Sequence, residues 1–426
     1  MSHFVIQGGK RLSGTYTPSG NKNAVLPMLA AATLTDEPVV LRNVPLIKDV
    51  HTMLQILEYL GADVELRGHT VTIRAGKIRR RKLPADLCHR VRSSILFAGP
   101  LCARYSRAIL SPPGGDGIGR RPLDTHFSGL RALGIDVRGD QVYRFECKKL
   151  KGADIVLDEA SVTATENILM AAVIAAGRTT IYNAACEPHV QDLCLMLNKM
   201  GARIRGIGTN YLTVDGVTSM GGVSHRVCAD HIEIASFIAA SAVTGGDLTV
   251  SGVDAGTLTA IERGFHKLGV RWQIDRQTLH LPPAQKLRVE NDHGSAVPKI
   301  EDGVWPHFPS DLMSVATVVA TQAKGTVLFF EKMFESRMYF VDHLINMGAR
   351  IVQCDPHRVM VMGPSRLRAT RLPSPDIRAG MTMVVAALCA RGQSVIGNAD
   401  IIDRGYEAVE VKLRRLGADI TRVADG

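Results

Sequence analysis

The sequence predicts an α/β protein of two domains, each made of three β-α-β-α-β-β repeats with helices inside and sheets outside. Three observations predict this fold class. The chain has 426 residues, which is too long for one ordinary hydrophobic core. A short motif, Leu or Met followed by Gly and then by alternating apolar and polar residues, occurs six times. An apolar, Ala-rich segment of helical length lies upstream of each copy.

The recurring motif is typical of the end of a helix and the start of a strand. Its copies are LGADV at 60–64, LGIDV at 133–137, MGARI at 200–204, LGVRW at 268–272, MGARI at 347–351 and LGADI at 416–420. We expect each glycine to adopt the left-handed conformation that ends a helix, and the residue before it to make the last apolar contact. The copies are roughly seventy residues apart, which is the length of one repeat.

Each repeat is expected to contain one buried and one amphipathic helix. The second helix, for example Val50–Leu60, has one apolar face and lies outside the first. Strand-like runs such as Glu37–Val44, Arg178–Ala184 and Gly325–Glu331 follow the first helix. The predicted buried helices are Asn23–Leu34, Ser93–Arg104, Glu166–Ala176, Ile232–Thr244, Asp311–Gln322 and Met381–Ala390.

The domain boundary is expected near Gly221–Asp230, between the third and fourth repeats. The second half of the chain lacks one strand, which the N-terminal segment Phe4–Tyr16 can supply. We therefore predict a first domain at 22–229 and a second domain formed by 1–21 together with 230–426.

Composition points to a cytoplasmic protein without a membrane span. The longest apolar runs, such as Met383–Cys389, are far shorter than the ~20 residues that a span needs. The N-terminal segment has no signal-peptide core. Eight cysteines are scattered without a CxxC pair, so we expect neither a disulfide framework nor a metal site.

The net charge of +10 favours anionic ligands, which leaves two interpretations. One is a small polyanionic substrate, and the other is a non-catalytic protein that binds nucleic acid. The densest basic run, Lys77–Lys82, has no interleaved aromatic residues of the kind that single-strand binding surfaces show. We therefore interpret this run as a solvated surface segment and expect neither nucleic acid nor a membrane as partner.

The loop Ser111–His126, SPPGGDGIGRRPLDTH, combines four glycines with an acid among them, Asp116, and two adjacent arginines. Glycines let the backbone approach a ligand closely, and arginines near a helix start attract anions. Position 120 is Arg where a dinucleotide fingerprint needs its third Gly, which argues against that motif. Asp116 is then either a turn residue or a catalytic acid.

Further motifs surround other charged residues. They are SGNKNAVLP at 19–27, WPHFPSD at 305–311, FESR at 334–337, DIRAG at 376–380 and IDRGYE at 402–407. Lys22 lies just before a buried helix, and Asp311 is a plausible N-cap of another. With these motifs in this order, the whole chain resembles the enolpyruvyl transferases of the EPSP synthase-like family, and within it the branch that acts on UDP-N-acetylglucosamine.

The resemblance implies a fold of two inside-out α/β barrels that close over a cleft. It implies transfer of the enolpyruvyl group of phosphoenolpyruvate to the 3′-hydroxyl of UDP-N-acetylglucosamine with release of phosphate, the first committed step of peptidoglycan biosynthesis. Addition gives a tetrahedral ketal, which collapses by elimination. No cofactor or metal is needed, since arginines and a lysine can neutralise the anions. Another acceptor, such as shikimate 3-phosphate, is the alternative.

The resemblance also implies the site residues. The catalytic group is Lys22, Asp116, Asp311 and Arg404, with Asp311 taking the proton of the sugar hydroxyl. The substrate-binding group is Asn23, Arg92, Arg121, Pro122, Leu123, Asp124, Thr125, Ser161, Val162, Thr163, Met333, Arg337, Asp376 and Arg378. Most members have Cys where this sequence has Asp116, and fosfomycin alkylates that thiol. We therefore expect Asp116 to be the proton donor and the protein to resist fosfomycin.

Overall fold

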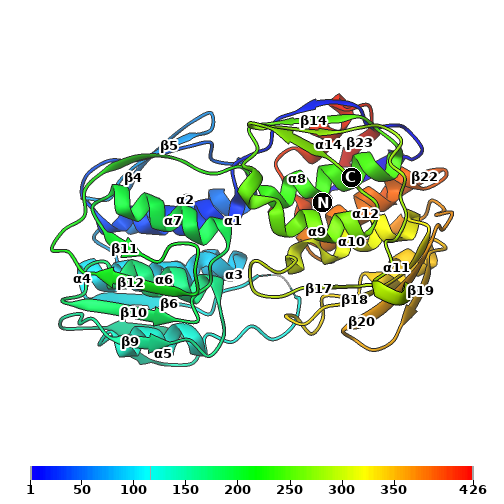
Figure 1. The fold of residues 1–426 in the computed structure, drawn as a ribbon. Coiled ribbons are helices and arrows are strands. Elements are labelled where there is room, and N and C mark those ends of the chain that lie inside the picture. The colour runs from blue at the N-terminus through cyan, green and yellow to red at the C-terminus, as the bar shows by residue number, and fades with distance from the viewer. Residues whose placement is uncertain (1, 116, 425–426) are drawn as a thin grey trace. The chain divides into compact units, whose positions relative to one another are not determined.

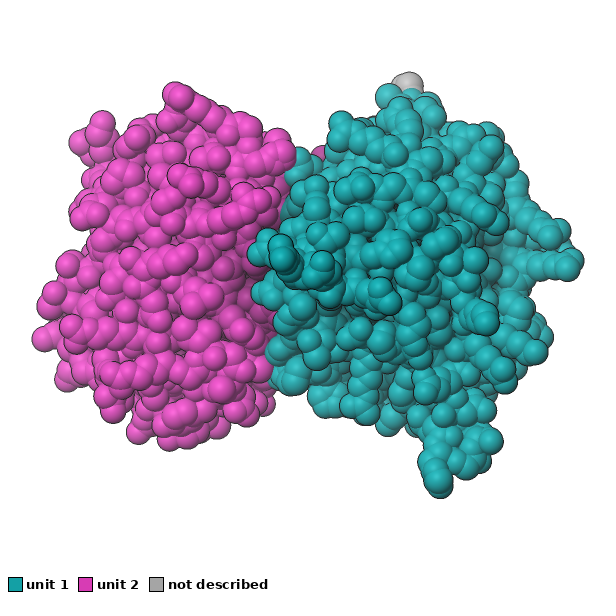
Figure 2. All heavy atoms as spheres, turned by 45° about the horizontal axis from the view of Figure 1, so that its top comes forward, with its two compact units in different colours: residues 1–19, 116–120, 229–426 teal, residues 20–115, 121–228 magenta. Residues whose placement is uncertain are grey.

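The computed structural model describes residues 2–115 and 117–424, which fall into two compact units (Figure 1). Unit 1 comprises residues 1–19, 116–120 and 229–426, and unit 2 comprises residues 20–115 and 121–228 (Figure 2). Each unit has its own cluster of buried apolar side chains. No helix among the described residues is both long and apolar enough to cross a membrane.

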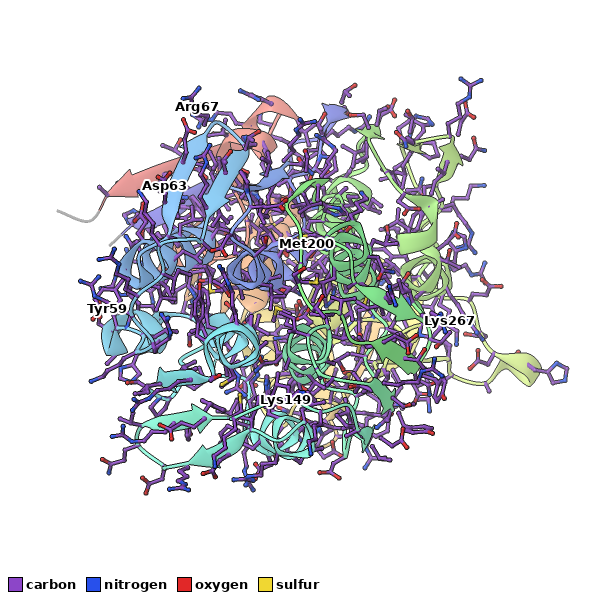
Figure 3. The ribbon with its side chains drawn as sticks, turned by 90° about the vertical axis from the view of Figure 1, so that its left-hand side faces the viewer. Tyr59, Asp63, Arg67, Lys149, Met200 and Lys267 are labelled. Carbon is purple, nitrogen blue, oxygen red and sulfur yellow. The ribbon has the colours of Figure 1, made fainter. Side chains whose placement is uncertain are left out.

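The described part of unit 2 forms three small sheets, in the strand orders β13-β3-β5-β4, β6-β8-β7 and β11-β12-β10-β9. Charged side chains such as Asp63, Arg67 and Lys149 lie on the outside of this unit (Figure 3). The strands are β3 (Val39–Arg42), β4 (Asp63–Arg67), β5 (Thr70–Arg74), β6 (Arg107–Leu110), β7 (Asp136–Arg138), β8 (Tyr143–Glu146), β9 (Asp154–Val156), β10 (Arg178–Tyr182), β11 (Arg203–Arg205), β12 (Tyr211–Asp215) and β13 (Val223–Arg226).

The described part of unit 1 also forms three sheets, in the orders β21-β22-β1-β23, β15-β16-β14-β2 and β17-β18-β20-β19. Every four-stranded sheet of either unit contains one parallel pair, as a repeated topology requires. The strands are β1 (Ser2–Gln7), β2 (Gly14–Tyr16), β14 (Leu248–Ser251), β15 (Gln273–Asp275), β16 (Thr278–Leu281), β17 (Lys299–Glu301), β18 (Gly325–Phe330), β19 (Arg350–Gln353), β20 (Arg358–Gly363), β21 (Arg371–Leu372), β22 (Gln393–Ile396) and β23 (Asp419–Ala424).

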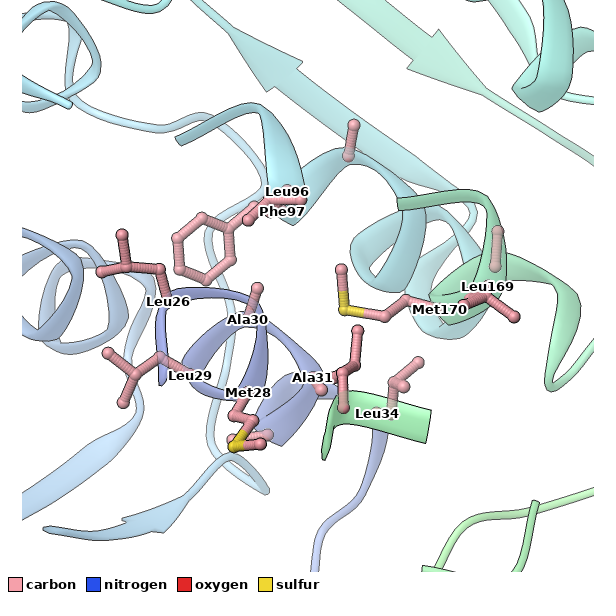
Figure 4. Close-up of a cluster of buried hydrophobic side chains, with 14 of the residues drawn as sticks. Leu26, Met28, Leu29, Ala30, Ala31, Leu34, Leu96, Phe97, Leu169 and Met170 are labelled. Atoms are coloured by element: carbon pink, nitrogen blue, oxygen red, sulfur yellow. The ribbon is translucent and has the colours of Figure 1, made fainter. Parts of the chain in front are cut away.

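The core of unit 2 is formed by helices such as α1 and α6 that are buried along most of their length. Residues from α1, η1, η2 and α6 meet in a cluster that includes Met28, Phe97 and Met170 (Figure 4). Burying a side chain of this size stabilises the fold by about 1.5–3 kcal/mol. The helices are α1 (Lys22–Ala31), η1 (Ala32–Leu34), α2 (Lys48–Leu60), α3 (Ala85–Arg90), η2 (Arg92–Phe97), α4 (Ala98–Tyr105), α5 (Asp124–Ala132), α6 (Val162–Ala172) and α7 (Pro188–Lys199).

In unit 1 the helices α8, α10 and α12 pack against one another and are buried along most of their length (Figure 1). The amphipathic α9 lies nearer the surface, with Ile261 and Phe265 turned inward. The helices are α8 (His231–Thr244), η3 (Ala255–Thr257), α9 (Thr259–Lys267), η4 (His293–Ser295), α10 (Ser310–Gln322), α11 (Val341–Asn346), α12 (Ile377–Cys389), α13 (Ala399–Ile402) and α14 (Val409–Arg415).

The six glycines of the recurring motif all adopt the left-handed conformation, as predicted. Each follows a helix and precedes a strand or an extended segment. An L side chain is strained at such an angle, so glycine is the residue that ends these helices well. The φ values are 107° for Gly61, 94° for Gly134, 103° for Gly201, 83° for Gly269, 98° for Gly348 and 99° for Gly417. Buried helices, surrounding sheets and these turns confirm the predicted fold class.

Three predicted helix boundaries are wrong, for local reasons. The helix predicted at Glu166–Ala176 begins at Val162, because the Ser161 hydroxyl accepts a hydrogen bond from Ala164 N at 3.4 Å. The helix predicted at Met381–Ala390 begins at Ile377, where Asp376 caps it. The segment Ser93–Arg104 divides into the 3₁₀ helix η2 and α4.

The N-terminal strand lies inside a sheet built by the other end of the chain. β1 pairs antiparallel with both β22 and β23, and Phe4 and Ile6 are fully buried. β2 pairs with β14 in a second sheet of the same unit. The expectation that the N-terminal segment supplies strand to the second half is therefore confirmed.

Candidate active site

Lys22 is the first residue of α1 and is buried, with only 8% of its surface exposed. Its ammonium nitrogen lies 2.8 Å from Asp49 Oδ2, and Asp49 belongs to the first turn of α2. Asn21 caps α1 by accepting a hydrogen bond from Ala24 N at 3.0 Å. Lys22 is thus held at the start of a rigid helix, and Asn23, the next residue, is half-buried.

Arg92 begins η2 and reaches the segment that precedes α5. Its Nη2 donates to the backbone oxygen of Arg121 at 2.5 Å and to that of Pro122 at 3.3 Å. Burial, followed by the charge of Arg121, lowers the pKa of Arg92 to about 10. A half-buried guanidinium beside a second one is a favourable place for an anion. Leu123 is buried here, whereas Asp124, which begins α5, is exposed.

The substrate-binding candidates Thr125 and Ser161–Thr163 lie at the starts of two helices. Ser161 caps α6, and Val162 and Thr163 form its first turn. Thr163 Oγ1 lies 3.0 Å from Nε2 of the buried His126, which follows Thr125 on α5. Because the Nδ1 atom of His126 accepts a hydrogen bond from the amide of Asn167 at 3.1 Å, its Nε2–H donates to Thr163.

His126 is a neutral structural residue. Burial and then the charge of Arg92 lower its pKa to about 3. The ring joins α5 to α6 and fixes Thr163 relative to Thr125. The geometry therefore supports a structural role for this histidine.

In unit 1, Asp311 lies between two buried arginines. Its Oδ1 accepts a hydrogen bond from Nη2 of Arg337, and its Oδ2 accepts from Nε and Nη2 of Arg378 at 3.0 and 2.9 Å. Both arginine residues are only 5% exposed. The three residues come from α10, the segment after β18, and α12. The structure therefore brings together three predicted residues that are far apart in sequence.

The prediction that Asp311 caps α10 is wrong. The helix begins at Ser310, its N-cap is Pro309, and Asp311 lies within the first turn. The Asp311 carboxylate is engaged by the two arginines. The Ser310 hydroxyl is directed toward Glu331, at 2.9 and 3.0 Å from its two oxygens.

The charges of both arginines are fixed by their neighbours. Burial opposes the charged form of Arg378, but Asp311 and then Tyr406 raise its pKa above the ordinary value. Burial also opposes the charge of Arg337, and Asp311, followed by Asp376, raises its pKa. The guanidinium of Arg378 also lies 5.3 Å from the ring centre of Tyr406. Both side chains are permanent cations.

The other unit 1 candidates lie on neighbouring segments. Asp376 caps α12 by accepting from Arg378 N at 2.8 Å and from Ala379 N at 3.0 Å. Arg404 is half-buried, shortly after α13, and its backbone N–H donates to Ile401 O at 3.2 Å. Met333 is 40% exposed on the segment that leads to Arg337.

The glycine-rich loop contributes its central part to unit 1. Ser336 N donates to Ile118 O at 3.2 Å, and Arg120 N donates to Glu335 Oε2 at 3.3 Å. Ile118 is buried in the same unit. The loop is therefore anchored one and two residues before Arg337. Asp116, the predicted acid, lies outside the described residues.

Two partners were not identified from the sequence. Asp49, which pairs with Lys22, lies in the first turn of the amphipathic α2, where a charged residue is ordinary. Asn167, which orients His126, is a polar residue within the otherwise buried α6, and this feature could have identified it. Among the described residues, no group of three or more His, Cys, Asp or Glu side chains could hold a metal ion.

A surface hollow of unit 1, about 670 Å³ in volume, contains none of the predicted site residues. It is lined by the segments 282–286 and 288–291 together with Gly269 and Arg271. We therefore define the candidate site by its charged side chains and not by this hollow.

Family comparison gives a match along nearly the whole chain. The family described as EPSP synthase (3-phosphoshikimate 1-carboxyvinyltransferase) matches residues 6–426. The UDP-N-acetylglucosamine 1-carboxyvinyltransferases of Treponema denticola and Treponema pallidum are each 53% identical to this chain over 421 residues, 99% of both chains. The protein of the same name from Bradyrhizobium diazoefficiens is 52% identical over 423 residues, 99% of this chain and 98% of its own.

Solved structures show the same fold. The enolpyruvyl transferase NikO from Streptomyces tendae superposes with a TM-score of 0.88 at 24% identity, covering 100% of this chain and 99% of its own. The EPSP synthase from Acinetobacter baumannii gives a TM-score of 0.77 at 19% identity and covers 100% of both chains. These likenesses confirm the predicted inside-out α/β architecture.

Proposed function

This chain belongs to the EPSP synthase family, and we propose that it is an enolpyruvyl transferase that uses UDP-N-acetylglucosamine as acceptor. It transfers the enolpyruvyl group of phosphoenolpyruvate to the 3′-hydroxyl of the sugar and releases phosphate. This reaction is the first committed step of peptidoglycan synthesis. The observation that carries the acceptor identity is the 53% identity, over 99% of both chains, to relatives named for this reaction.

The arginine pair around Asp311 supports its role as the base. Two guanidiniums hold Asp311 as a carboxylate and fix its orientation, and only the carboxylate can accept a proton. In the addition step the 3′-oxygen bonds to C2 of phosphoenolpyruvate, and Asp311 takes the hydroxyl proton. The methylene carbon C3 gains a proton in the same step. The product is a tetrahedral ketal that still carries the phosphate.

Elimination then completes the transfer. The C2–O bond to phosphate breaks, C3 loses a proton, and the carbon–carbon double bond forms again. We assign the phosphate contacts to Lys22, Arg121 and Arg404. Cations held in place by their surroundings stabilise the charge that develops on this leaving group. Arg92, Arg337 and Arg378 hold the other anionic groups of the two substrates.

Asp116 is the proposed acid that protonates C3. The proposal rests on its place in the glycine-rich loop, where most members of the family have Cys. A free carboxylic acid has a pKa near ~3.9 and a thiol near ~8.5. Asp116 therefore has to gain its proton in the substrate-loaded site, where bound anions and the loss of water favour the neutral acid.

The remaining assignments rest on the family resemblance. Asn23, Thr125 and Asp124 contact the acceptor, together with Pro122, Leu123, Ser161, Val162, Thr163, Met333 and Asp376. The protein acts in the cytoplasm, where both substrates are found. We keep 22–229, and 1–21 with 230–426, as the proposed domains. Neither a cofactor nor nucleic acid takes part.

Phosphate release tests the function. Purified protein is incubated with phosphoenolpyruvate and either UDP-N-acetylglucosamine or shikimate 3-phosphate, and the products are identified by mass spectrometry. We expect phosphate release with the nucleotide sugar and a product heavier by one enolpyruvyl group. Turnover of shikimate 3-phosphate alone would overturn the acceptor assignment. Absence of turnover with both, combined with salt-sensitive retention on DNA, would favour the nucleic-acid interpretation.

A further inference from the structure

Two fully buried carboxyl groups, those of Asp302 and Glu331, lie close to the Asp311 site. Asp302 follows β17 and Glu331 follows β18, and these two strands are parallel neighbours in which Glu301 is opposite Phe330. The next positions along the strands are Asp302 and Glu331, and both are 0% exposed. Acidic side chains are almost never buried completely unless they are paired, so this location requires an explanation.

Glu331 connects the two segments that carry Asp311 and Arg337. Its carboxyl oxygens accept from the hydroxyl of Ser310, the first residue of α10, at 2.9 and 3.0 Å. Its Oε1 also accepts from Met333 N at 3.2 Å and from Phe334 N at 3.1 Å. One carboxyl group therefore fixes the start of α10, beside Asp311, relative to the backbone that leads to Arg337.

The Asp302 carboxylate accepts one backbone hydrogen bond, and its second oxygen has no donor. Its Oδ1 accepts from Lys332 N at 2.5 Å. Its Oδ2 is buried and has no hydrogen-bond partner among the described residues. A buried acceptor without a donor is unfavourable. A proton on Glu331, directed at Asp302 Oδ2, satisfies this oxygen.

Electrostatics favours the same proton. Two ionised carboxylates side by side in a buried site repel each other strongly, so one of them keeps its proton. Burial and then the neighbouring Asp302 raise the pKa of Glu331, and these effects outweigh the opposing charge of Arg337. The hydrogen bonds and the charge balance thus require one proton for the pair.

We propose that Asp302 and Glu331 share one proton and act as a positioning pair, which holds Asp311 and Arg337 in the arrangement that the reaction needs. The inference rests on the proposed function, because that function assigns the roles of Asp311 and Arg337. Loss of the shared proton puts two negative charges side by side in the buried site. The segment 332–337 and the start of α10 then move apart, and the Asp311 site loses its geometry.

Other charged groups surround the pair from every element packed against it. The backbone of Glu331 is fixed by His357, in the turn between β19 and β20. Glu331 N donates to His357 O at 2.8 Å, and the ring Nδ1 of His357 donates to Glu331 O at 2.9 Å. The remaining groups are Arg337 and Lys332 on the segment after β18, Asp311 on α10, and Glu301 on β17. Glu301 and Lys332 are solvent-accessible and pair with each other at 3.6 Å, so they screen the pair only weakly.

The test replaces each carboxyl group by an amide, which does not titrate but can make the same hydrogen bonds. In Glu331→Gln, the amide oxygen accepts from Met333 and Phe334, and the amide NH₂ donates to Asp302 Oδ2. In Asp302→Asn, the NH₂ donates to an ionised Glu331. We expect the alkaline limb of the wild-type kcat/KM profile to contain a second ionisation, above that of Asp116, and both variants to lose it. A second ionisation that persists in both variants would overturn the positioning role.

Thermal unfolding tests the shared proton independently of activity. A raised pKa in the folded state means that wild-type stability is lost as pH rises from the ordinary glutamate value through the folded value. Glutamine does not titrate, so the Tm of Glu331→Gln relative to wild type should increase between pH 5 and pH 9. A constant difference would contradict a shared proton.

Glu301→Gln is the matched control. It removes a carboxylate one residue from Asp302, but one that is accessible to solvent. We expect its pH profile and its Tm difference to follow the wild type. An effect equal to that of Glu331→Gln would show that general charge removal, and not the buried pair, is its cause. If the wild type transfers no enolpyruvyl group at all, the proposed function fails, while the Tm comparison still tests the pair.

Discussion

Asp311 has two fixed partners, and this explains how one carboxylate can be both oriented and ionised. The guanidiniums of Arg337 and Arg378 are buried and permanently charged, so they hold the carboxylate whatever the pH in the neutral range. In the proposed reaction, Asp311 takes up its proton once substrate anions engage the two arginines.

Asp116 is where the protein should differ most from relatives with cysteine. Asp116→Asn cannot donate a proton and should reduce kcat by at least about a hundredfold. Asp116→Cys should keep turnover and shift the basic limb of the pH–rate profile upward, because a thiol has the higher pKa. Steady-state kinetics over pH 5–10 measure both effects.

The cysteine variant provides its own control through fosfomycin. A thiolate opens the epoxide, whereas a carboxylate is a far poorer nucleophile. Wild type should therefore keep its activity on preincubation with fosfomycin, and Asp116→Cys should lose activity with time and gain the mass of the drug. Rapid inactivation of the wild type with an adduct on Asp116 would contradict the assignment, as would full activity of Asp116→Asn.

His126 should make the fold sensitive to acid. Its pKa is about 3 in the folded protein and ~6.5 in an unfolded chain, so the unfolded state binds more protons between these values. The stability that depends on neutral His126 is complete above pH 6.5 and falls as pH decreases, by up to about 1.4 kcal/mol per pH unit. Denaturant unfolding of His126→Gln should show a smaller loss between pH 7 and pH 5. An equal loss in both proteins would refute this explanation.

Single residues also mark the limit of what the sequence predicts. The motifs led to Asp311, Arg337 and Arg378, but not to their mutual contacts, which depend on how three segments pack. Asp311 was expected to cap α10, yet that helix starts at Ser310. Capping is a local signal, and here the tertiary contacts of the carboxylate with two arginines prevail.

At the scale of elements, the approach of α4 to α6 depends on one glycine. A Cβ at Gly99 would lie 2.2 Å from Asn167 O and 2.6 Å from Asn167 Oδ1. Gly99 N also donates to Asn167 Oδ1 at 2.7 Å, and the same side chain donates to Ile95 O at 3.0 Å. The contact is therefore between backbone atoms that cannot move independently.

Gly99→Ala should thus lower the free energy of unfolding by about 1–3 kcal/mol, as overpacking does elsewhere. Denaturant unfolding followed by circular dichroism measures the change. Gly397→Ala is the matched control, because its Cβ would meet only Leu372 O at 3.7 Å, an ordinary contact. A change of equal size in both variants would show that close packing at Gly99 is not the cause.

Element boundaries were predicted less well than element types. The apolar pattern identified the buried helices, but it missed the first turns of α6 and α12, which are capped by Ser161 and Asp376. These first turns carry polar residues such as Thr163 and the buried Arg378, which a search for apolar residues does not detect.

At the scale of the whole molecule, the repeat was the feature that the sequence predicted best. A glycine with positive φ is needed in all six repeats, and this requirement is visible in the sequence itself. The grouping of Ile118 and Arg120 with unit 1 was not visible, because their neighbours in sequence belong to unit 2. Only contacts with Glu335 and Ser336 reveal it.

Hydrogen exchange can test the central position of β1. Its residues pair on both sides, with β22 and with β23, so their amides should exchange only when the unit opens. We expect residues 4–6 to exchange at least about a hundredfold more slowly than the edge strand β21. Mass spectrometry of N-terminal peptides measures this. Fast exchange at 4–6 would contradict the observed pairing.

The order of synthesis on the ribosome affects the two units differently, because β1 is made long before the strands that it pairs with. Unit 2 has all its sheets once residue 228 has emerged. β1 has to wait for residues 393–396 and 419–424 before both of its edges are paired. During that time Phe4 and Ile6 are exposed on an unpaired strand, the kind of segment that aggregates. The start of the chain is therefore where a nascent-chain chaperone gives the greatest benefit.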